Sequence, residues 1–262
     1  MDLRLQGKAA LVTGSTGGIG LEIARALGVE GVAVTVVGRT ASKVEAAVSS
    51  IRQSGGGASG IVADVTAAEG AVEVVKCLSE VDILVNNLGI YEMKEFGDIT
   101  DDEWRRYFEV NVLSGVRLTR SYFPGMLDRD WGRIIFVSSE SALFGPKELI
   151  HYAVTKTAQL TIARGLSELT KGTKVTVNSI MPGPTRSEGL NEFLKANASD
   201  KSASPEAMEA EFFRSFRPDS LLQRFIEPTE IGGFVAYLAS PLSAATNGAA
   251  LRIEGGLLRT IA

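Results

Sequence analysis

The sequence predicts an α/β fold, a three-layer doubly wound parallel sheet of about seven strands with helices on both faces. Short apolar runs alternate with longer amphipathic stretches from the first residues onward. Most of the short runs are almost continuously hydrophobic, which is typical of parallel strands that are covered on both faces. A glycine-rich turn directly joins the first apolar run to the first amphipathic stretch, as expected at the start of a strand-helix-strand unit.

Short length and apolar composition predict the strands. They are Lys8–Thr13, Val32–Val37, Gly60–Ala63, Asp82–Val85, Arg133–Val137, Lys174–Ile180 and Ala249–Ile253. Amphipathic periodicity predicts the helices. These are Gly18–Glu30, Ala41–Ser54, Ala67–Leu78, Asp101–Asp128, His151–Thr170 and Pro228–Ala239. Two of them carry start signals, because Thr100 stands three residues before Glu103 and Pro228 opens the last helix.

Two segments interrupt this alternation. Ser54–Gly60 is rich in glycine and serine and is expected to be a flexible turn before the third strand. The stretch 184–225 lies between the sixth strand and the last helix, with helical pieces expected around Leu190–Ala196 and Pro205–Phe216. A long excursion at this point is expected to be a substrate lid. No repeat or linker divides the sequence, so residues 1–262 are expected to form one domain.

The composition excludes several functional classes. The net charge of −4 lacks the basic excess of a nucleic-acid-binding protein. No apolar run approaches the roughly 20 residues that cross a bilayer. Because Cys77 and His151 are the only cysteine and histidine, an intrachain disulfide and a cysteine- or histidine-rich metal site are excluded. We therefore expect a cytoplasmic protein with no metal site, no membrane and no nucleic-acid partner.

The glycine-rich turn is the first candidate binding site. It reads Thr13-Gly14-Ser15-Thr16-Gly17-Gly18-Ile19-Gly20. Glycines between a strand and a helix let the backbone approach a pyrophosphate, which the N-terminal dipole of the helix stabilises. The spacing here is Gly-x-x-x-Gly-x-Gly, which differs from the Gly-x-Gly-x-x-Gly fingerprint. A glycine-rich segment by itself is equally typical of a plain tight turn.

With this spacing the sequence resembles the short-chain dehydrogenase/reductase family, in its short-subunit branch. The residues that match the glycine loop of the family are Thr13, Gly14, Gly18, Ile19 and Gly20. Asn86-Asn87-Leu88-Gly89 follows the fourth strand, where the family usually has Asn-Asn-Ala-Gly, so that Leu88 departs from the pattern. The resemblance extends from Leu5 to Gly256. It implies a Rossmann fold and an NAD(P)(H)-dependent oxidoreductase that interconverts a carbonyl and a secondary alcohol.

The resemblance also implies the cofactor contacts. They are Gly14, Ser15, Thr16, Gly18, Ile19, Gly20, Arg39, Thr40, Asp64, Val65, Asn87, Gly89, Tyr152, Lys156, Pro182, Gly183, Thr185 and Ser187. In the family the residue at Asp64 contacts the adenine ring. The segment that begins at Pro182-Gly183 lies against the nicotinamide, and Ser187 stands where threonine is more common.

The end of the second strand bears on the choice between NADP(H) and NAD(H). An acidic residue there binds the ribose 2′-hydroxyl, whereas an arginine accommodates a 2′-phosphate. This chain has Gly38 at the usual acidic position and Arg39 next, and a guanidinium pairs with a phosphate through two parallel hydrogen bonds. NADP(H) is therefore favoured over NAD(H). Two observations favour the other choice: Gly17 replaces a basic residue found in many NADP-dependent members, and a loop arginine is often only a solvated charge.

Tyr152 and Lys156 are the candidate proton-transfer pair. Their i, i+4 spacing places both on one face of a predicted helix. A free phenol titrates near 10, so lowering its pKa to about 7 needs about 4 kcal/mol of differential stabilisation. A neighbouring ammonium supplies part of that stabilisation because it favours the phenolate. The Tyr-x-x-x-Lys pattern alone is also typical of a surface packing pair.

The resemblance completes a catalytic tetrad of Asn111, Ser139, Tyr152 and Lys156. Ser139 lies 13 residues before Tyr152 and is implied to bind the substrate carbonyl, whereas Ser138 is expected to satisfy local backbone. Asn111 is implied to support a water chain to Lys156, which also holds the nicotinamide ribose. An asparagine inside a helix is unfavourable by propensity, which itself indicates a purpose. His151 is expected to be a pocket or surface residue and Cys77 a core residue.

The expected partner is a small-molecule carbonyl or alcohol substrate. Its contacts are expected from Tyr91, Glu140, Leu143, Phe144, Leu149 and the segment 187–217. Aromatic and basic residues in that segment, Arg217 among them, suit an acyl or acidic substrate, or only an amphipathic lid. The alternatives are a 3-oxoacyl-[acyl-carrier-protein] reductase and a non-catalytic NADP-sensing protein on the same fold; an epimerase or dehydratase of the extended branch ranks last. The family usually forms tetramers through the helices predicted at 101–128 and 151–170, so we expect a homotetramer.

Overall fold

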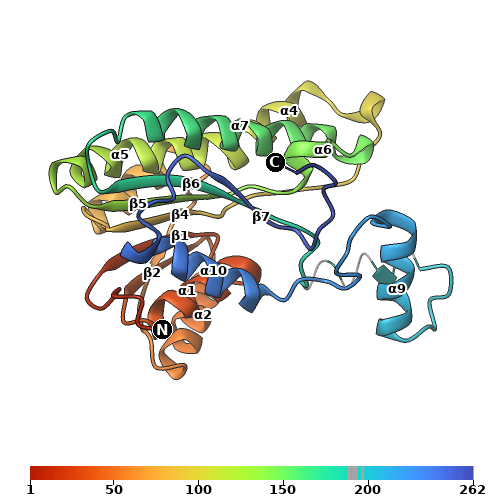
Figure 1. Cartoon of the computed structure of the whole chain (residues 1–262), viewed down its shortest axis with the longest axis horizontal. Helices are drawn as coiled ribbons and strands as arrows, with labels where there is room; N and C mark the ends of the chain where they lie inside the picture. The colour runs from red at the N-terminus through yellow and green to blue at the C-terminus, as the bar shows by residue number, and fades with distance from the viewer. Residues whose placement is uncertain (188–189, 191–193, 196–197, 262) are drawn as a thin grey trace.

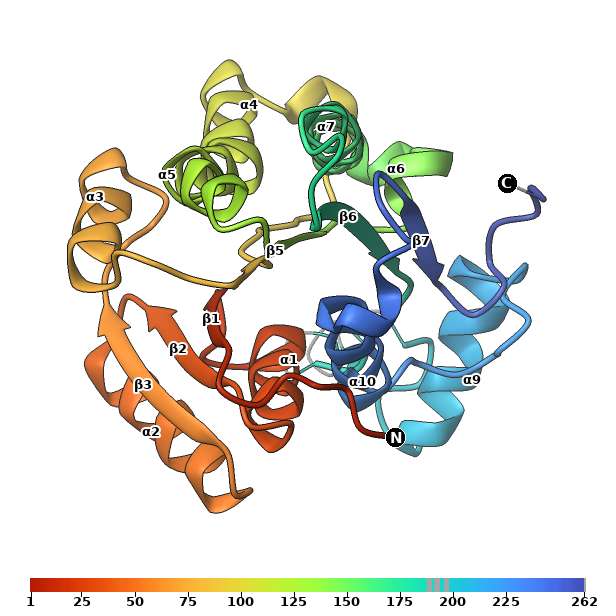
Figure 2. The ribbon, with the colours of Figure 1, turned by 60° about the vertical axis from the view of Figure 1, so that its left-hand side comes forward.

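A parallel sheet forms the centre of the protein, in a computed structural model that describes residues 1–187, 190, 194–195 and 198–261. Its strand order is β3-β2-β1-β4-β5-β6-β7, and every neighbouring pair is parallel. The strands are β1 (Ala9–Thr13), β2 (Ala33–Gly38), β3 (Gly57–Val62), β4 (Ile83–Asn86), β5 (Gly132–Val137), β6 (Val175–Pro182) and β7 (Ala250–Ile253). Figures 1 and 2 show helices on both sides of this sheet, which confirms the predicted doubly wound architecture.

Two helical layers cover the sheet, each with its own apolar core. One layer contains α1 (Gly18–Val29), α2 (Ala41–Gln53) and α10 (Pro228–Ala239); the other contains α3 (Ala68–Cys77), α4 (Asp101–Phe108), α5 (Ser114–Asp128) and α7 (Ile150–Glu168). Shorter helical elements are η1 (Phe96–Asp98), α6 (Ser141–Phe144), η3 (Lys147–Leu149) and η4 (Pro241–Ser243). Because both faces of the central strands are buried, these strands are apolar throughout, as the sequence indicates.

The predicted element bounds agree with the structure to within about three residues, with two informative differences. β3 begins at Gly57, so the prediction of a flexible turn over Ser54–Gly60 is wrong for its second half, which is a strand. This strand lies at the edge of the sheet beside β2 and lacks an apolar pattern. The predicted helix Asp101–Asp128 is divided by the π-helical turn η2 (Glu109–Leu113). Cys77 is exposed at the end of α3, which corrects the expectation of a core residue, because the helix buries Gly70, Ala71 and Val74 instead.

The excursion between β6 and α10 carries α9 (Pro205–Phe216), which confirms the predicted helical piece there. The piece expected at Leu190–Ala196 lies in part outside the described residues. α9 has a small apolar core of its own, formed by Leu194, Met208, Phe212, Phe213 and Phe225. The excursion therefore packs as a separate unit beside the sheet, at the right of Figure 1.

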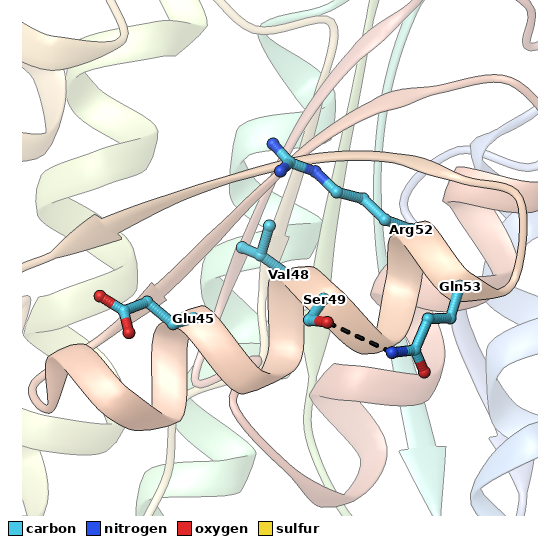
Figure 3. A pocket seen from close by; sticks show the side chains of 5 residues that line it. All are labelled: Glu45, Val48, Ser49, Arg52 and Gln53. Atoms are coloured by element: carbon cyan, nitrogen blue, oxygen red, sulfur yellow. Dashed lines mark hydrogen bonds between the residues drawn. The ribbon is translucent and has the colours of Figure 1, made fainter.

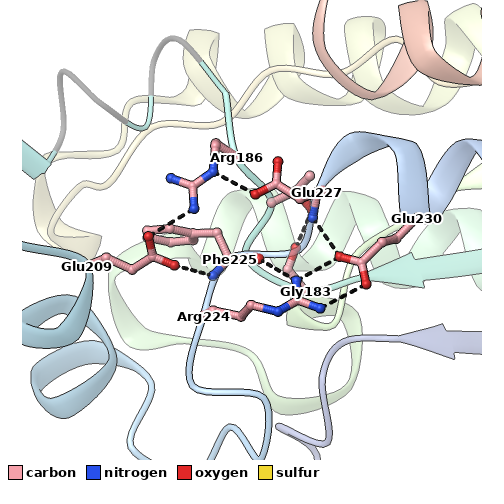
Figure 4. Close-up of polar contacts among 8 residues, drawn as sticks. Gly183, Arg186, Glu209, Arg224, Phe225, Glu227 and Glu230 are labelled. Atoms are coloured by element: carbon pink, nitrogen blue, oxygen red, sulfur yellow. Dashed lines mark hydrogen bonds and ion pairs between the residues drawn. The ribbon is translucent and has the colours of Figure 1, made fainter. Parts of the chain in front are cut away.

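Ion pairs hold α9 to the loop that leads into α10 (Figure 4). Arg186 donates from Nη2 to Glu209 Oε2 at 2.9 Å and from Nε to Glu227 Oε1 at 2.8 Å. Glu209 also accepts a hydrogen bond from the backbone N–H of Phe225 at 2.8 Å. A guanidinium that bridges two carboxylates fixes both ends of the excursion relative to β6.

The turn from β1 into α1 requires glycine at two positions for different reasons. Gly18 has a φ of +54°, which side chains rarely tolerate. Gly20 has an ordinary φ, but a Cβ there would collide with Asn87 Nδ2 and the carbonyl oxygen of Gly14. Gly17, in contrast, has extended backbone and open space around its Cα. The close approach of α1 to β4 therefore depends on Gly20.

We expect Gly20→Ala to lower the free energy of unfolding by about 1–3 kcal/mol, since it overpacks this junction. The matched control Gly17→Ala, three positions earlier, should change it by no more than about 0.5 kcal/mol because nothing opposes the new methyl group. Urea unfolding of both variants without cofactor measures the difference. Equal stabilities for the two variants would show that the junction does not constrain the fold.

Candidate active site

The candidate site lies along the edge of the sheet where the carboxyl ends of the strands meet. The chain leaves β1 toward β2 and β3 on one side, while β4 to β7 extend on the other, so the topology reverses between β1 and β4. Such a reversal leaves a crevice at the strand ends, which is the usual ligand position in open α/β sheets. Gly14, Asn87, Ser139 and Gly183 all follow strand ends at this edge.

A cleft of 770 Å³ occupies the part of this edge nearest β1 and β2. Predicted cofactor contacts make up part of its lining, namely Gly14, Thr16, Arg39, Asp64 and Val65. Arg39 is exposed, so its guanidinium is free to turn toward a bound anion. A Cβ on Gly38 would lie 2.5 Å from Thr16 Cγ2, so an acidic side chain at this position would displace Thr16. Sequence reasoning missed Arg105 and Arg106 of α4, which also line the cleft.

The start of α1 fits a pyrophosphate. Its N-cap is Gly17, so within the described part of the chain no side chain caps the N-terminal amides, and the first turn carries no acidic residue. An uncapped helix N-terminus presents free N–H donors and a positive dipole end to an anion. Gly17 and Gly18 leave open space at the positions that a Cβ would fill. The residues present therefore fit a dinucleotide cofactor.

Several predicted cofactor contacts use their side chains to build the site. Asn87 Nδ2 donates to the carbonyl oxygens of Thr13 at 2.9 Å and Gly14 at 3.1 Å, which ties the glycine loop to β4. Ser15 is fully buried and donates to Val12 O at 2.6 Å. Asp64 accepts hydrogen bonds from the N–H and hydroxyl of Thr66. These side chains fix the backbone of the cleft.

The other end of the edge is built by β6 and the segment after it. A Cβ on Gly183 would lie 2.8 Å from Glu254 Cα, so glycine is needed for this packing. Thr185 Oγ1 donates to Gly183 O at 2.8 Å, and Ser187 Oγ accepts from Leu190 N at 3.1 Å. Pro182, Gly183, Thr185 and Ser187 thus form one ordered segment, although the Ser187 hydroxyl is used in a local turn.

Lys156 is buried, at 3% exposed, beneath the middle of this edge. Its ammonium donates to Val137 O at 2.8 Å and Gln159 Oε1 at 3.3 Å. Both acceptors are neutral, and burial lowers the pKa of Lys156 to about 7. A Cβ on Gly89 would lie 3.3 Å from Nζ, which places this predicted cofactor contact directly beside the ammonium.

Asn111 occupies the π-helical turn η2, a feature that often marks functional positions. Its side chain exchanges two hydrogen bonds with the backbone of Ile90 and donates to Thr155 Oγ1 at 3.0 Å. Gln159 donates to the backbone carbonyl of Asn111 at 2.6 Å while accepting from Lys156. Sequence reasoning missed Gln159; its position three residues after Lys156 on α7 is the only signal for it.

Tyr152 and Ser139 meet above Lys156. The Tyr152 ring centroid lies 5.6 Å from Lys156 Nζ. Burial, followed by the negative charge of Glu140, raises the pKa of Tyr152, while a hydrogen bond with Ser139 opposes that rise. Ser138 donates instead to Lys156 O at 2.8 Å, so it satisfies local backbone as expected. The structure thus brings the four predicted catalytic residues into one cluster.

Glu140 and Arg217 complete the surroundings of Ser139. Ser139 Oγ donates to Glu140 Oε2 at 2.5 Å. Arg217, which follows α9, lies with Nη2 3.8 Å from Glu140 Oε1. Burial raises the pKa of Glu140, whereas the Ser139 hydrogen bond and the charge of Arg217 oppose that rise. The excursion therefore places the positively charged side chain of Arg217 beside this cluster.

His151 is only 1% exposed, which corrects the expectation of a pocket or surface position. Its ring packs against Tyr107 at a centroid distance of 4.2 Å and against Trp104 at 6.2 Å. Burial lowers the pKa of His151 and favours the neutral ring. His151 thus packs between α4 and α7, outside the Tyr152 cluster.

A second hollow, on the outer surface of α2, is lined by none of the predicted site residues (Figure 3). Glu45, Val48, Ser49, Arg52 and Gln53 line it. None of these residues is buried, and the guanidinium of Arg52 donates two hydrogen bonds to Ala58 O. Within the described part of the chain, no three His, Cys, Asp or Glu residues group as metal ligands, and no helix is both long and apolar enough to traverse a bilayer.

Comparison with known proteins gives a consistent result. Residues 8–198 match the family model of short chain dehydrogenases. The chain is 49% identical to the uncharacterized oxidoreductase YvaG of Bacillus subtilis, over 100% of both chains. It is 28% identical to the 3-oxoacyl-[acyl-carrier-protein] reductase FabG of Aquifex aeolicus, over 98% of this chain and 100% of that one.

Solved structures extend the comparison to the fold. The L-sorbose reductase from Gluconobacter frateurii, in a complex with NADPH and L-sorbose, superposes with a TM-score of 0.92 at 29% identity over 100% of both chains. The glycine junction, the cleft and the tetrad of this chain lie within the matched residues. The chain therefore belongs to the short-chain dehydrogenase/reductase family of NAD(P)-dependent oxidoreductases.

Proposed function

We propose that the protein uses NADP(H) to interconvert a carbonyl compound and a secondary alcohol, with Tyr152 as general acid and base. The observation that carries the proposal is the cluster of Tyr152 with the buried Ser139 and Lys156 at the sheet edge, next to a cleft that fits a dinucleotide. When bound, the cofactor supplies or accepts the hydride. The chain then has to bind the carbonyl, move one proton and keep the reactants aligned.

Each residue of the cluster has a distinct task. In reduction Tyr152 gives its proton to the carbonyl oxygen, and in oxidation it takes the proton from the alcohol. The Ser139 hydroxyl, which donates to Glu140 in the structure, turns to donate to the same oxygen and stabilises its developing negative charge. Lys156, when protonated, favours the phenolate form of Tyr152. Gln159 and Asn111 are positioning residues. Gln159 accepts a hydrogen bond from the Lys156 ammonium, and the backbone carbonyl of Asn111 in η2 holds Gln159 in turn.

Arg39 supports NADP(H) over NAD(H). It lies in the cleft beside Gly38, where an acidic side chain would displace Thr16. A guanidinium at this position pairs with a 2′-phosphate, which NAD(H) lacks. The similar L-sorbose reductase is described in a complex with NADPH, which agrees with this choice.

We infer that residues 1–262 form one domain and that its excursion 184–225 is the substrate lid, since this segment brings Arg217 to Glu140.

We also infer a homotetramer. Phe108, Leu113 and Val154 are apolar and exposed on α4, η2 and α7, the helical layer that the family resemblance assigns to subunit contacts. Contacts with further copies would cover them.

Tyr152→Phe should lower kcat/KM for ketone reduction by at least about 100-fold, because the proton donor is lost while the ring remains. Tyr237→Phe is the matched control, since Tyr237 is exposed on α10 and lines neither the cleft nor the catalytic cluster. NADPH oxidation followed by absorbance measures both variants. Full activity of Tyr152→Phe would refute the assignment.

Arg39→Ala should raise the KM for NADPH by about 10- to 100-fold, since hydrogen bonds between charged groups contribute about 1.5–3 kcal/mol. The KM for NADH should change little. Arg52→Ala, which removes an exposed arginine of α2 outside the cleft, is the control for loss of charge. A variant whose NADPH and NADH constants change equally would show that Arg39 does not read the phosphate.

The pH profiles of the two directions should be opposite. Oxidation needs the phenolate of Tyr152, so its kcat/KM rises with pH, whereas reduction needs the phenol and falls at high pH. Because the charge of Glu140 raises the pKa of Tyr152, Glu140→Gln should move both limbs to lower pH. Profiles of wild type and variant in both directions test this; a shift to higher pH would contradict it.

A further inference from the structure

Glu140 and Arg217 form a buried pair that the proton-transfer chemistry does not use. Their side chains are 7% and 12% exposed, although one comes from the end of β5 and the other from the excursion. The ring of Phe144 lies 5.4 Å from the guanidinium carbon of Arg217 and supports its position. Opposite charges on two elements therefore meet beside Ser139.

This pair is poorly satisfied as it stands. The Nη2–Oε1 distance of 3.8 Å exceeds a hydrogen bond. Arg217 Nη1 donates to Phe216 O at 2.8 Å, but Nε is buried and has no hydrogen-bond partner in the described part of the chain. A buried donor without an acceptor is costly, so such an atom indicates a missing polar group.

The polar group that Arg217 Nε lacks has to lie next to the reacting carbonyl of the substrate. Ser139 Oγ, which binds the carbonyl oxygen in the proposed function, is 2.5 Å from Glu140 Oε2. A substituent on the carbon adjacent to the carbonyl therefore approaches the carboxylate. A carboxylate only accepts hydrogen bonds, whereas a guanidinium only donates them. A hydroxyl group satisfies both, since it donates to Glu140 and accepts from Arg217.

Other substituents fit less well. A substrate carboxylate would place a second negative charge beside Glu140, which already balances Arg217. A methylene group, as in a simple ketone or a 3-oxoacyl chain, would leave Arg217 Nε without an acceptor and would give Glu140 no donor beyond Ser139.

We propose that Glu140 and Arg217 recognise a hydroxyl group on the carbon next to the reacting carbonyl, so that the preferred substrates are neutral α-hydroxyketones and, in oxidation, vicinal diols. This inference rests on the proposed function. Because Arg217 follows α9, the packing of the excursion sets the position of one half of this recognition pair.

The test compares kcat/KM at saturating NADPH for hydroxyacetone, butan-2-one, methoxyacetone and pyruvate. Butan-2-one replaces the hydroxyl by a methyl group, and methoxyacetone keeps the electron-withdrawing oxygen but lacks its proton. Wild type should prefer hydroxyacetone over both by at least about tenfold, because a site built to bind a hydroxyl rejects analogues without one. This comparison needs no variant, so it stands even where a substitution impairs folding.

Glu140→Gln and Arg217→Met should each lower the hydroxyacetone-to-butan-2-one ratio by at least about tenfold, and Arg217→Lys should restore part of it. Arg259→Met, which removes an exposed arginine outside the segment 187–217, should keep the wild-type ratio. A structural defect would lower both rates together and leave the ratio unchanged.

Three results would overturn the inference. Equal turnover of hydroxyacetone and its analogues would refute the inferred hydroxyl recognition but leave the proposed function intact. A preference for pyruvate that Arg217→Met abolishes would show an acid-binding site instead. No turnover of any ketone or diol removes the proposed function and this inference with it.

Discussion

The site depends on an ammonium group that is buried with no carboxylate partner among the described residues. Lys156 donates to a backbone carbonyl and to the amide oxygen of Gln159, and burial lowers its pKa to about 7. A neighbouring carboxylate would hold the proton on Lys156 but would also cancel its field at Tyr152. With neutral acceptors, the charge of Lys156 in its protonated form is not cancelled, and in the proposed function it stabilises the phenolate. The sheet edge, the π-helical turn and α7 all contribute to this arrangement.

Within the described residues, the carboxylate of this cluster is that of Glu140, and it contacts Ser139 and Arg217. Glu140 accepts from Ser139 and faces Arg217, so its charge is partly balanced by the excursion and not by Lys156. Two cations thus flank the site, one supplied by α7 and one by the segment after α9. Arg217 faces Glu140, which accepts a hydrogen bond from Ser139, so the excursion contributes a charge to the surroundings of Ser139. This links the position of the excursion to the chemistry.

Local patterns in the sequence predict much of this organisation. Apolar strands and the glycine loop define the sheet and its ligand edge, and the family motifs locate Asn111, Ser139, Tyr152 and Lys156, which the structure brings together. The sequence does not show the partners of those residues. Gln159 and the pairing of Glu140 with Arg217 depend on contacts between distant elements, and the burial of His151 depends on aromatic residues of α4. The edge strand β3 was partly missed because its glycine-rich sequence has no apolar alternation.

We propose that the charge of Lys156 sets the proton affinity of Tyr152. The most direct measurement is an absorbance titration of the phenolate in the complex with NADP⁺, taken as wild type minus Tyr152→Phe and repeated in a Lys156→Met background. The Tyr152 phenol should titrate at higher pH when Lys156 is replaced, because the phenolate then loses its neighbouring cation. An unchanged or lower titration point in the Lys156→Met protein would contradict the claim.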